Sequence, residues 1–289
     1  IMTDLPMEGK KLFQKLWLRE QGPYCPELIQ YIGNHRNDYD AFLFVTYLYY
    51  TTAAGIEKCP EKAILIPTAH DEYCIYFPMY RKVFQSPRGI VYLTQAEEDF
   101  AEEMFSLQNK PHVIAGAGIE VPAEPNTKQA QQTYGIKDGY VIYVGRIDTG
   151  KNCQQLFQFF EKYKEETTGP LKLILVGKMM LEDPAHPDIK CLGYISEEDK
   201  YGLMAGAKAL ILPSEYESLS LSVLESMALG VPVLVNGKCQ VLRQHCEKSK
   251  GGFYYTGYEE FAKYLSQLVA DEECQRQMGS AARDYVRRE

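Results

Sequence analysis

The sequence of 289 residues lacks the features that mark several large classes of protein. It has no uninterrupted apolar run long enough to cross a bilayer. It also shows no signal peptide, although a native start upstream of Ile1 could carry one. Its eight cysteines include no Cys-x-x-Cys pair, so we expect reduced thiols rather than a zinc site or a disulfide framework. Its net charge of -8 argues against nucleic acid as the main partner. These absences favour a cytoplasmic protein, and they leave open a peripheral contact with the inner face of the membrane.

Two motifs for phosphate or metal binding are missing or out of place. The chain has no Gly-x-x-x-x-Gly-Lys-Ser/Thr segment, which excludes a P-loop. Its one Asp-x-Asp, Asp38-Tyr39-Asp40, precedes a predicted strand at 41–46 instead of following one. We therefore expect these aspartates to form a solvated turn at the N-terminal edge of a sheet, and we predict neither a metal site nor a cofactor.

Short apolar segments alternate with amphipathic segments along the whole chain. In the second half the predicted strands are 140–144, 172–177, 189–192, 208–212, 231–235 and 252–255. In the first half they are 41–46, 63–67, 89–94 and 113–116. Strands that alternate with helices in this way predict an α/β protein with doubly wound parallel sheets.

The composition of the chain and the positions of its proline-containing segments predict two Rossmann-like domains. The segment 120–133 contains two prolines, Asn126 and several glutamines, and it is the best candidate linker. We predict a first domain at 1–121, a linker at 122–136 and a second domain at 137–289. Because nothing before Ala41 reads as a strand, we expect the first domain to lack on the order of 80 residues, about half of a doubly wound domain. At the other end, we expect no helix after 283–289 that crosses back over the first domain.

A strand, a glycine-punctuated turn and a helix begin the second domain. The apolar run 140–144 leads into Gly145-Arg146-Ile147-Asp148-Thr149-Gly150-Lys151-Asn152 and then into an amphipathic stretch. A glycine lets the backbone approach an anion closely, and the start of a helix offers free N–H groups. Arg146 and Lys151 are unfavourable there without an anion, because the helix dipole is positive at that end. Ordinary surface cations are the alternative, and we favour an anion site.

A second block carries two carboxylates. The strand that ends at Pro213-Ser214 is followed by a polar loop with Glu217, a helix with Glu225 and a Gly230-Val231-Pro232 turn before the next buried strand. Such a loop lies at the carboxyl edge of a parallel sheet, where ligands bind in open α/β folds. Glu217 precedes the helix and Glu225 lies inside it, so the two need not share a helical face and can hold two ends of one ligand.

Two features of the first domain also invite a functional interpretation. His70, in Pro67-Thr68-Ala69-His70-Asp71-Glu72, follows a predicted strand, so we expect it at the carboxyl edge of the sheet, facing the cleft between the domains. The aromatic run 47–52 is suited to an acceptor groove, but we favour a packed helix start.

Together these blocks resemble the retaining glycosyltransferases of family 4, from about Trp17 to the end of the chain. The resemblance rests on Gly145-Arg146 with Lys151, on the Glu217 and Glu225 pair, and on the Gly-x-Pro-Val strand that follows it. It implies the GT-B architecture, in which two Rossmann-like domains face a cleft. It also implies a reaction that moves a sugar from a UDP-type or GDP-type donor to a glycan or lipid-linked acceptor with retention at the anomeric carbon.

The resemblance assigns roles to residues of this chain. It gives Arg146 and Lys151 the donor diphosphate, Glu217 the hydroxyls of the donor sugar, Glu225 those of the ribose, and His70 a position near the donor sugar. The remaining donor contacts that it implies are Gly145, Gly177, Tyr194, Ile195, Ser218, Leu219 and Ser220. No metal ion is needed if the protein supplies these charges.

Two other functions remain open at this point. A sugar-nucleotide epimerase shares the architecture and binds the same donor without an acceptor. A truncated module that binds a nucleotide but does not catalyse is the alternative that an incomplete first domain suggests. The Glu217 and Glu225 pair together with Gly145-Arg146 and Lys151 favours transfer.

Overall fold

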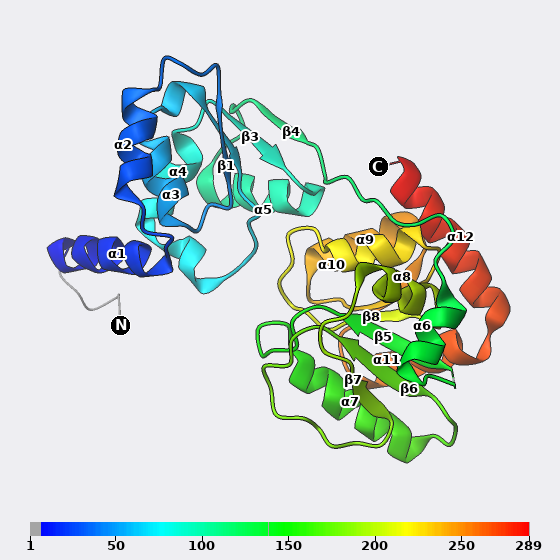
Figure 1. The fold of residues 1–289 in the computed structure, drawn as a ribbon. Helices are drawn as coiled ribbons and strands as arrows, with labels where there is room; N and C mark the ends of the chain where they lie inside the picture. Colours follow the sequence, from blue (N-terminus) through cyan, green and yellow to red (C-terminus); the bar gives the residue numbers. More distant parts are fainter. Residues whose placement is uncertain (1–6, 138, 289) are drawn as a thin grey trace. The chain divides into compact units, whose positions relative to one another are not determined.

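The computed structural model describes residues 7–137 and 139–288 of the chain. The chain divides into two compact units, Ile1–Ala117 and Gly118–Glu289, and each unit has its own parallel sheet. Figure 1 shows the elements of both units coloured along the sequence.

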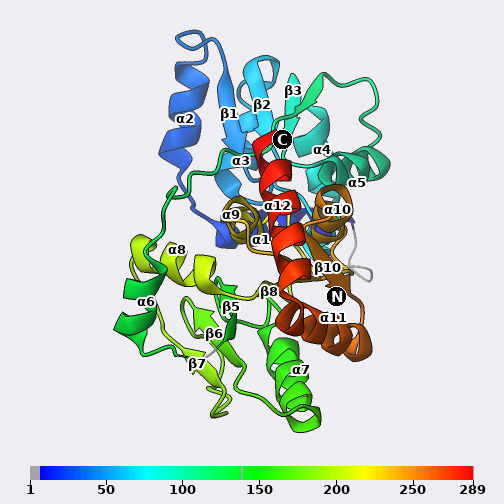
Figure 2. The same cartoon turned by 90° about the vertical axis from the view of Figure 1, so that its right-hand side faces the viewer.

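The first unit contains a four-stranded parallel sheet in the order β1-β2-β3-β4, and Figure 2 shows the first three of these strands side by side. The strands are β1 (Phe42–Val45), β2 (Ala63–Ile66), β3 (Gly89–Tyr92) and β4 (His112–Ile114). The helices are α1 (Met7–Gln21), α2 (Pro26–Asn34), α3 (Tyr50–Ile56), α4 (Pro78–Gln85) and α5 (Gln95–Phe105), with 3-10 turns η1 (Pro60–Lys62) and η2 (Tyr73–Tyr76).

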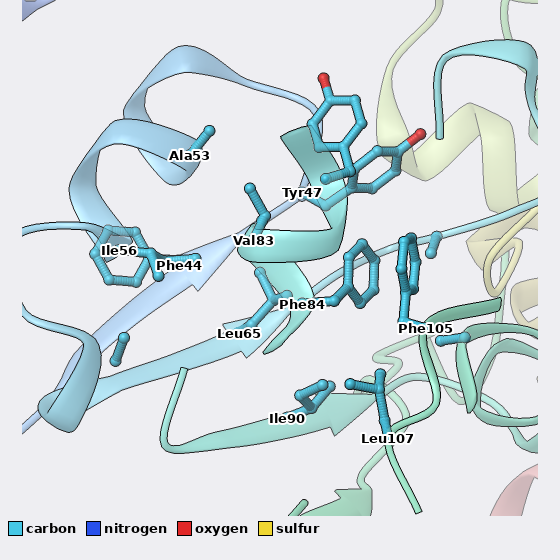
Figure 3. Packing of buried hydrophobic residues seen from close by; sticks show 14 of the residues in the cluster. Phe44, Tyr47, Ala53, Ile56, Leu65, Val83, Phe84, Ile90, Phe105 and Leu107 are labelled. Atoms are coloured by element: carbon cyan, nitrogen blue, oxygen red, sulfur yellow. The ribbon is translucent and has the colours of Figure 1, made fainter. Parts of the chain in front are cut away.

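The strands of this sheet follow one another in sequence order, so every crossover runs the same way. Right-handed crossovers then place α3, α4 and α5 on one face of the sheet. Figure 3 shows the core that results, with Leu65 and Ile90 of the strands packed beneath Ile56, Phe84 and Phe105 of the three helices. Phe84 and Phe105 stack with their ring centroids 4.1 Å apart.

A sheet wound in one direction has the arrangement of one half of a doubly wound sheet. Its other face is apolar and open among the described residues, with Leu43 65% exposed, Val45 57% and Val113 53%. No strand precedes β1 in the part of the chain that the structure describes.

The aromatic run 47–52 matches the packed helix start that we favoured. Tyr47 is 1% exposed, and its ring centroid lies 4.7 Å from that of Tyr80 in an edge-to-face contact. α3 begins three residues later, at Tyr50. The run therefore joins β1 to the core of the first unit.

The second unit contains a six-stranded parallel sheet. Its strands are β5 (Tyr140–Val144), β6 (Lys172–Val176), β7 (Ile189–Cys191), β8 (Leu210–Leu212), β9 (Val233–Asn236) and β10 (Gly252–Tyr255). Its helices are α6 (Thr127–Tyr134), α7 (Cys153–Glu166), α8 (Glu197–Gly206), α9 (Leu221–Ala228), α10 (Gln240–Ser249), α11 (Tyr258–Ala270) and α12 (Glu272–Arg288).

The strand order β10-β9-β8-β5-β6-β7 makes this sheet doubly wound. From β5 the chain runs outward through β6 and β7, and from β8 it runs outward the other way. α7 packs beside α11, while α12 contacts α9 and α10, so the strands lie between two helical layers (Figure 1). The order reverses between β5 and β8, and in open α/β sheets ligands bind outside the carboxyl ends of such strands. The predicted doubly wound fold is confirmed here.

The structure corrects the predicted linker at 122–136, because most of that segment is helix α6. Asn126 caps the helix by accepting the N–H of Gln129 at 3.2 Å, and Gly135 ends it with a φ of 63°. The buried Ala130 packs against Gly202 of α8, where a Cβ on the glycine would lie 2.8 Å from the Cβ of Ala130. A polar, proline-flanked segment can therefore still be structured, and the units divide earlier, after Ala117.

Residues 283–288 belong to helix α12, which packs against α9 within the second unit. Gly279 approaches Gly230 so closely that a Cβ on it would lie 2.0 Å from the Gly230 oxygen, and Arg283 donates to the carbonyl of Leu229 at 2.7 Å. Across the described residues, no helix has both the length and the hydropathy of a membrane span.

Candidate donor-binding site at the switch point of the second sheet

The loop after β5 is shaped by glycine and by a side-chain turn. Gly145 has a φ of 152°, in the region that favours glycine, and its N–H donates to the carbonyl of Val176 at 2.9 Å. Asp148 accepts the N–H of Lys151 at 2.8 Å and closes a tight turn just before α7. Arg146 is left 64% exposed, with its Nε 3.6 Å from Asp148 Oδ2. The loop thus keeps one cation in solvent and holds the other at the start of a helix.

Gly177 and Gly193 bring two further loops against the first one. Gly177 has a φ of 133°, and a Cβ on it would lie 2.0 Å from the Gly145 oxygen, so no other residue fits there without moving the backbone. Its N–H donates to the carbonyl of Gly193 at 2.8 Å. Tyr194, the next residue, is 79% exposed, and Ile195 is half-buried. The carboxyl ends of β5, β6 and β7 are therefore joined by backbone contacts.

The loop after β8 is anchored by amides from both sides. The carbonyl of Pro213 accepts Asn236 Nδ2 at 2.9 Å and Asn152 Nδ2 at 3.3 Å. Asn152 lies at the start of α7 and Asn236 at the end of β9, so the two neighbouring elements fix this loop. Ser220 ends the loop with a φ of 69°.

α9 begins at Leu221, three residues after Ser218. Ser218 is half-buried, while Leu219 and Ser220 are buried. These residues therefore form the turn that leads into the helix rather than its first turn.

Lys151 and Glu217 meet across the switch point. Lys151 Nζ lies 2.6 Å from Glu217 Oε1, and their side chains are 26% and 11% exposed. The contact joins the loop after β5 to the loop after β8, which are 66 residues apart in sequence. Partly buried charged groups need partners, and this contact gives each of the two groups a partner of opposite charge.

Glu225 lies on α9 and is contacted by residues of α8. Its Oε1 is 3.1 Å from Lys200 Nζ and accepts the hydroxyl of Tyr201 at 3.0 Å. Its side chain is 16% exposed. Glu217 before the helix and Glu225 within it thus have separate partners.

His70 belongs to the first unit, whereas the other predicted site residues belong to the second. It lies in the loop after β2, with its Nε2 3.6 Å from Glu72 Oε1, and Glu72 in turn accepts the hydroxyl of Tyr47 at 2.6 Å. The preceding residue, Ala69, donates its N–H to Glu97 of α5 at 2.6 Å. The loop is therefore held from both sides at the carboxyl edge of its own sheet.

Several residues that hold the site in place carry no signal in the sequence. His245 of α10 is 5% exposed, its Nε2 donates to the carbonyl of Leu219 at 2.9 Å, and its Nδ1 lies 3.0 Å from the hydroxyl of Tyr285. A histidine inside an amphipathic helix gives no sign of this contact. Lys200 and Tyr201 were missed for the same reason, since they look like ordinary surface residues of a helix with an acidic start.

One group of described residues could hold a metal ion, and it lies in the first unit. Glu98 and Glu102 of α5 and His112 of β4 bring their ligand atoms within 4.8 Å of one another. His112 Nε2 already lies 2.7 Å from Glu98 Oε1, so a direct contact between these two side chains accounts for the geometry. The Asp38-Tyr39-Asp40 turn is exposed and precedes β1, in agreement with our interpretation of it as a solvated turn.

Comparison with known proteins places these features in a family. Residues 126–285, more than half of the chain, match the glycosyl transferases group 1. The chain is 35% identical to O-antigen chain mannosyltransferase B of Escherichia coli over 106 residues, which are 33% of this chain and 28% of that protein. It is 30% identical to N-acetyl-alpha-D-glucosaminyl L-malate synthase of Bacillus anthracis over 177 residues, or 55% and 44% of the two chains. The matched segments thus span less than half of the length of either relative.

Solved structures share the fold at lower identity. Sucrose-phosphate synthase from Thermosynechococcus elongatus superposes with a TM-score of 0.74 at 15% identity, over 93% of this chain and 77% of that one. The Anabaena protein HepE, in complex with UDP and glucose, gives a TM-score of 0.71 at 15% identity, over 90% and 76%. These neighbours are glycosyltransferases of the GT-B fold, and the likeness confirms that fold for this chain. With a family match over its second unit and the same fold over most of its length, the chain belongs to the glycosyl transferases of group 1.

Proposed function

We propose that this chain is part of a retaining glycosyltransferase that takes its sugar from a nucleoside-diphosphate donor. The observation that carries the proposal is the contact of Lys151 with Glu217 at the point where the strand order reverses. This contact brings a cation suited to a diphosphate and a carboxylate suited to sugar hydroxyls into one site. The UDP bound in the neighbour HepE supports a donor of this class.

Each charged residue has a distinct task in the proposed reaction. Breaking the bond between the sugar and the diphosphate places negative charge on the leaving phosphate oxygen. Arg146, Lys151 and the N–H groups at the start of α9 stabilise that charge, and preorganised donors of this kind are a large source of rate enhancement. Because these charges come from the protein, the proposal requires no metal ion.

Lys151 can serve both of its partners at once. An ammonium group has three N–H donors, and Glu217 takes one of them at 2.6 Å. The other donors are available to phosphate oxygens. Glu217 has two oxygens, so it can keep Lys151 and also accept a hydroxyl of the donor sugar. Glu225 is proposed to accept the ribose hydroxyls, and His70 to approach the donor sugar from the first domain.

The acceptor is proposed to be a glycan or a lipid-linked sugar. Curated relatives of this chain include a mannosyltransferase of O-antigen chains and a transferase that acts on a diphospho-undecaprenol substrate, which supports this class. Because the chain spans less than half of these relatives, we assign the donor site to this chain and the transfer reaction to the whole protein.

Calorimetry tests the donor site directly. We expect UDP or GDP to bind this chain and the matching nucleoside, uridine or guanosine, to bind at least about 10-fold more weakly, because the phosphates contact Arg146 and Lys151. Equal affinity for nucleotide and nucleoside, or no binding of either nucleotide by folded protein, would contradict the proposal.

A further inference from the structure

Both contacts of Glu225 fall on the same oxygen. Lys200 Nζ lies 3.1 Å from Oε1, and the Tyr201 hydroxyl donates to Oε1 at 3.0 Å. Within the described residues Oε2 takes part in no hydrogen bond. The carboxylate is therefore oriented through one oxygen, while the other remains available to a ligand.

The charges around Glu225 make this orientation a stable one. The side chain of Lys200 is only 13% exposed, and charges withdrawn from water in this way need partners. Burial alone would lower the pKa of Lys200, but its contacts with Glu197 and Glu225 outweigh burial and raise that pKa. Its Nζ also lies 4.2 Å from the centroid of the Tyr201 ring. The ammonium therefore stays charged and holds Oε1 toward α8.

Helix α8 gives Lys200 and Tyr201 a rigid backbone. Ser196 caps the helix by accepting the N–H of Asp199 at 3.1 Å, and Gly202 packs closely against α6. The Tyr201 hydroxyl also lies 3.3 Å from the carbonyl of Glu120, but it has one proton, and the nearer and charged acceptor is Glu225. Both positioning groups are thus consecutive residues of one fixed helical turn.

We propose that Lys200 and Tyr201 are positioning residues that set the ribose selectivity of the donor site by holding Glu225 with Oε2 turned toward the ligand. The inference rests on the proposed function, which gives Glu225 the ribose hydroxyls. A merely structural brace would change the affinity of every nucleotide alike. A positioning role instead changes the preference for a ribose over a sugar that lacks its hydroxyls.

Calorimetry on the complete chain tests this with UDP and 2′,3′-dideoxy-UDP, or with the guanine pair if GDP binds more tightly. We expect the unmodified protein to bind UDP about 10-fold or more tightly than the dideoxy nucleotide, the scale of one hydrogen bond to a charged group. Tyr201→Phe and Lys200→Met should each bring that ratio to about threefold or less and leave the affinity for the dideoxy nucleotide nearly unchanged. Tyr134→Phe is the matched control, because its hydroxyl donates to Asp199 of the same helix at 3.1 Å without touching Glu225. It should keep the full ratio.

The outcomes separate the inference from the proposed function. If the folded, unmodified chain binds neither UDP nor GDP, the proposed function and the inference both fail. If it prefers UDP and both variants keep that preference, the inference alone fails. The inference also fails if the variants lose both nucleotides equally together with melting temperature, or if the unmodified chain shows no preference for the ribose.

Discussion

Arg146 and Lys151 are both cations of the same loop, but the fold uses them differently. The side chain of Arg146 is 64% exposed, and its Nε lies 3.6 Å from Asp148 Oδ2, a loose contact. The side chain of Lys151 is 26% exposed, and its Nζ directly contacts Glu217, whose side chain is 11% exposed. Exposed ion pairs add little to stability, and the loss of a partner from a partly buried charge costs more. Substitutions of both residues should therefore weaken nucleotide binding, but only the substitution of Lys151 should also lower the stability of the fold.

Arg146→Ala and Lys151→Ala should each weaken UDP or GDP binding by about 10-fold or more, the loss of one charge-assisted contact. Arg146→Ala should leave the melting temperature unchanged. Lys151→Ala should lower stability by about 1–3 kcal/mol, because Glu217 loses its partner. Calorimetry and thermal denaturation measure both effects.

Arg276→Ala is the control, since Arg276 forms an exposed i, i+3 pair with Glu273 on helix α12. It should change neither property. Normal nucleotide affinity in Lys151→Ala together with a large loss of stability would show that Lys151 only supports the fold.

Glu97 in the first unit should make stability depend on pH. It is 1% exposed and accepts the N–H groups of Ala69 and Leu93, each at 2.6 Å. Burial raises its pKa from 4.5 to about 7, although these two N–H groups act to lower it. The folded state therefore keeps a proton that the unfolded state loses between these values, and stability should fall as pH rises from 4.5 to 7 and then level off.

The free energy of unfolding of the unmodified chain, relative to Glu97→Gln, should fall by about 2–3 kcal/mol between pH 5 and pH 8. Urea denaturation followed by tryptophan fluorescence reports on this unit, because Trp17 is the only tryptophan of the chain. Its ring packs against that of Phe77, with the two ring centroids 5.0 Å apart. A difference that stays constant over this range would mean that the two N–H groups keep Glu97 ionised throughout.

At the scale of elements, the contact between α6 and α8 depends on the absence of side chains. A Cβ on Gly202 would lie 2.8 Å from the Cβ of Ala130 and 3.0 Å from the oxygen of Asn126. This contact turns a segment with linker-like composition into a helix of the second unit. It also holds the helix that carries Lys200 and Tyr201.

Gly202→Ala should therefore destabilise the protein by about 1–2 kcal/mol, even though alanine is the better helix former by about 1 kcal/mol, because overpacking costs more than the gain in propensity. Gly33→Ala is the control. A Cβ on that glycine of helix α2 would lie 3.7 Å from its nearest neighbour, the side chain of Lys58, which is an ordinary van der Waals distance. It should be neutral or stabilising. Thermal denaturation compares the two, and a stable Gly202→Ala protein would show that α6 moves freely against α8.

At the scale of the whole molecule, each unit has its own sheet and its own core. The proposed donor site, apart from His70, lies entirely in Gly118–Glu289. We expect a fragment of residues 118–289 to fold with a single cooperative transition and to bind UDP or GDP with the affinity of the whole chain. Circular dichroism and calorimetry measure this, and a fragment that folds but binds no nucleotide would show that the first unit supplies part of the site.

The sequence by itself determined the alternation of strands and helices. Strands of a parallel sheet that are buried on both faces appear in the sequence as short apolar runs, and local composition is enough to show them. It also located the loops with Arg146, Lys151 and Glu217 and the helix with Glu225, since glycine, cations and carboxylates near strand ends are typical of a ligand site. Strand limits differed by at most two residues, as at β8, which begins at Leu210 rather than at residue 208. Such ends depend on backbone pairing with neighbours, which local composition does not specify.

Only the tertiary structure decided which of these groups meet. Lys151 and Glu217 are 66 residues apart, and their contact follows from β5 and β8 lying next to each other where the strand order reverses. Helix α6 forms in a polar segment because Gly202 leaves room for it, and Lys200, Tyr201 and His245 reach the site because the helices that carry them pack beside α9 and its preceding loop. Packing across the sheet brings together residues that are distant in sequence, and no local pattern records those contacts.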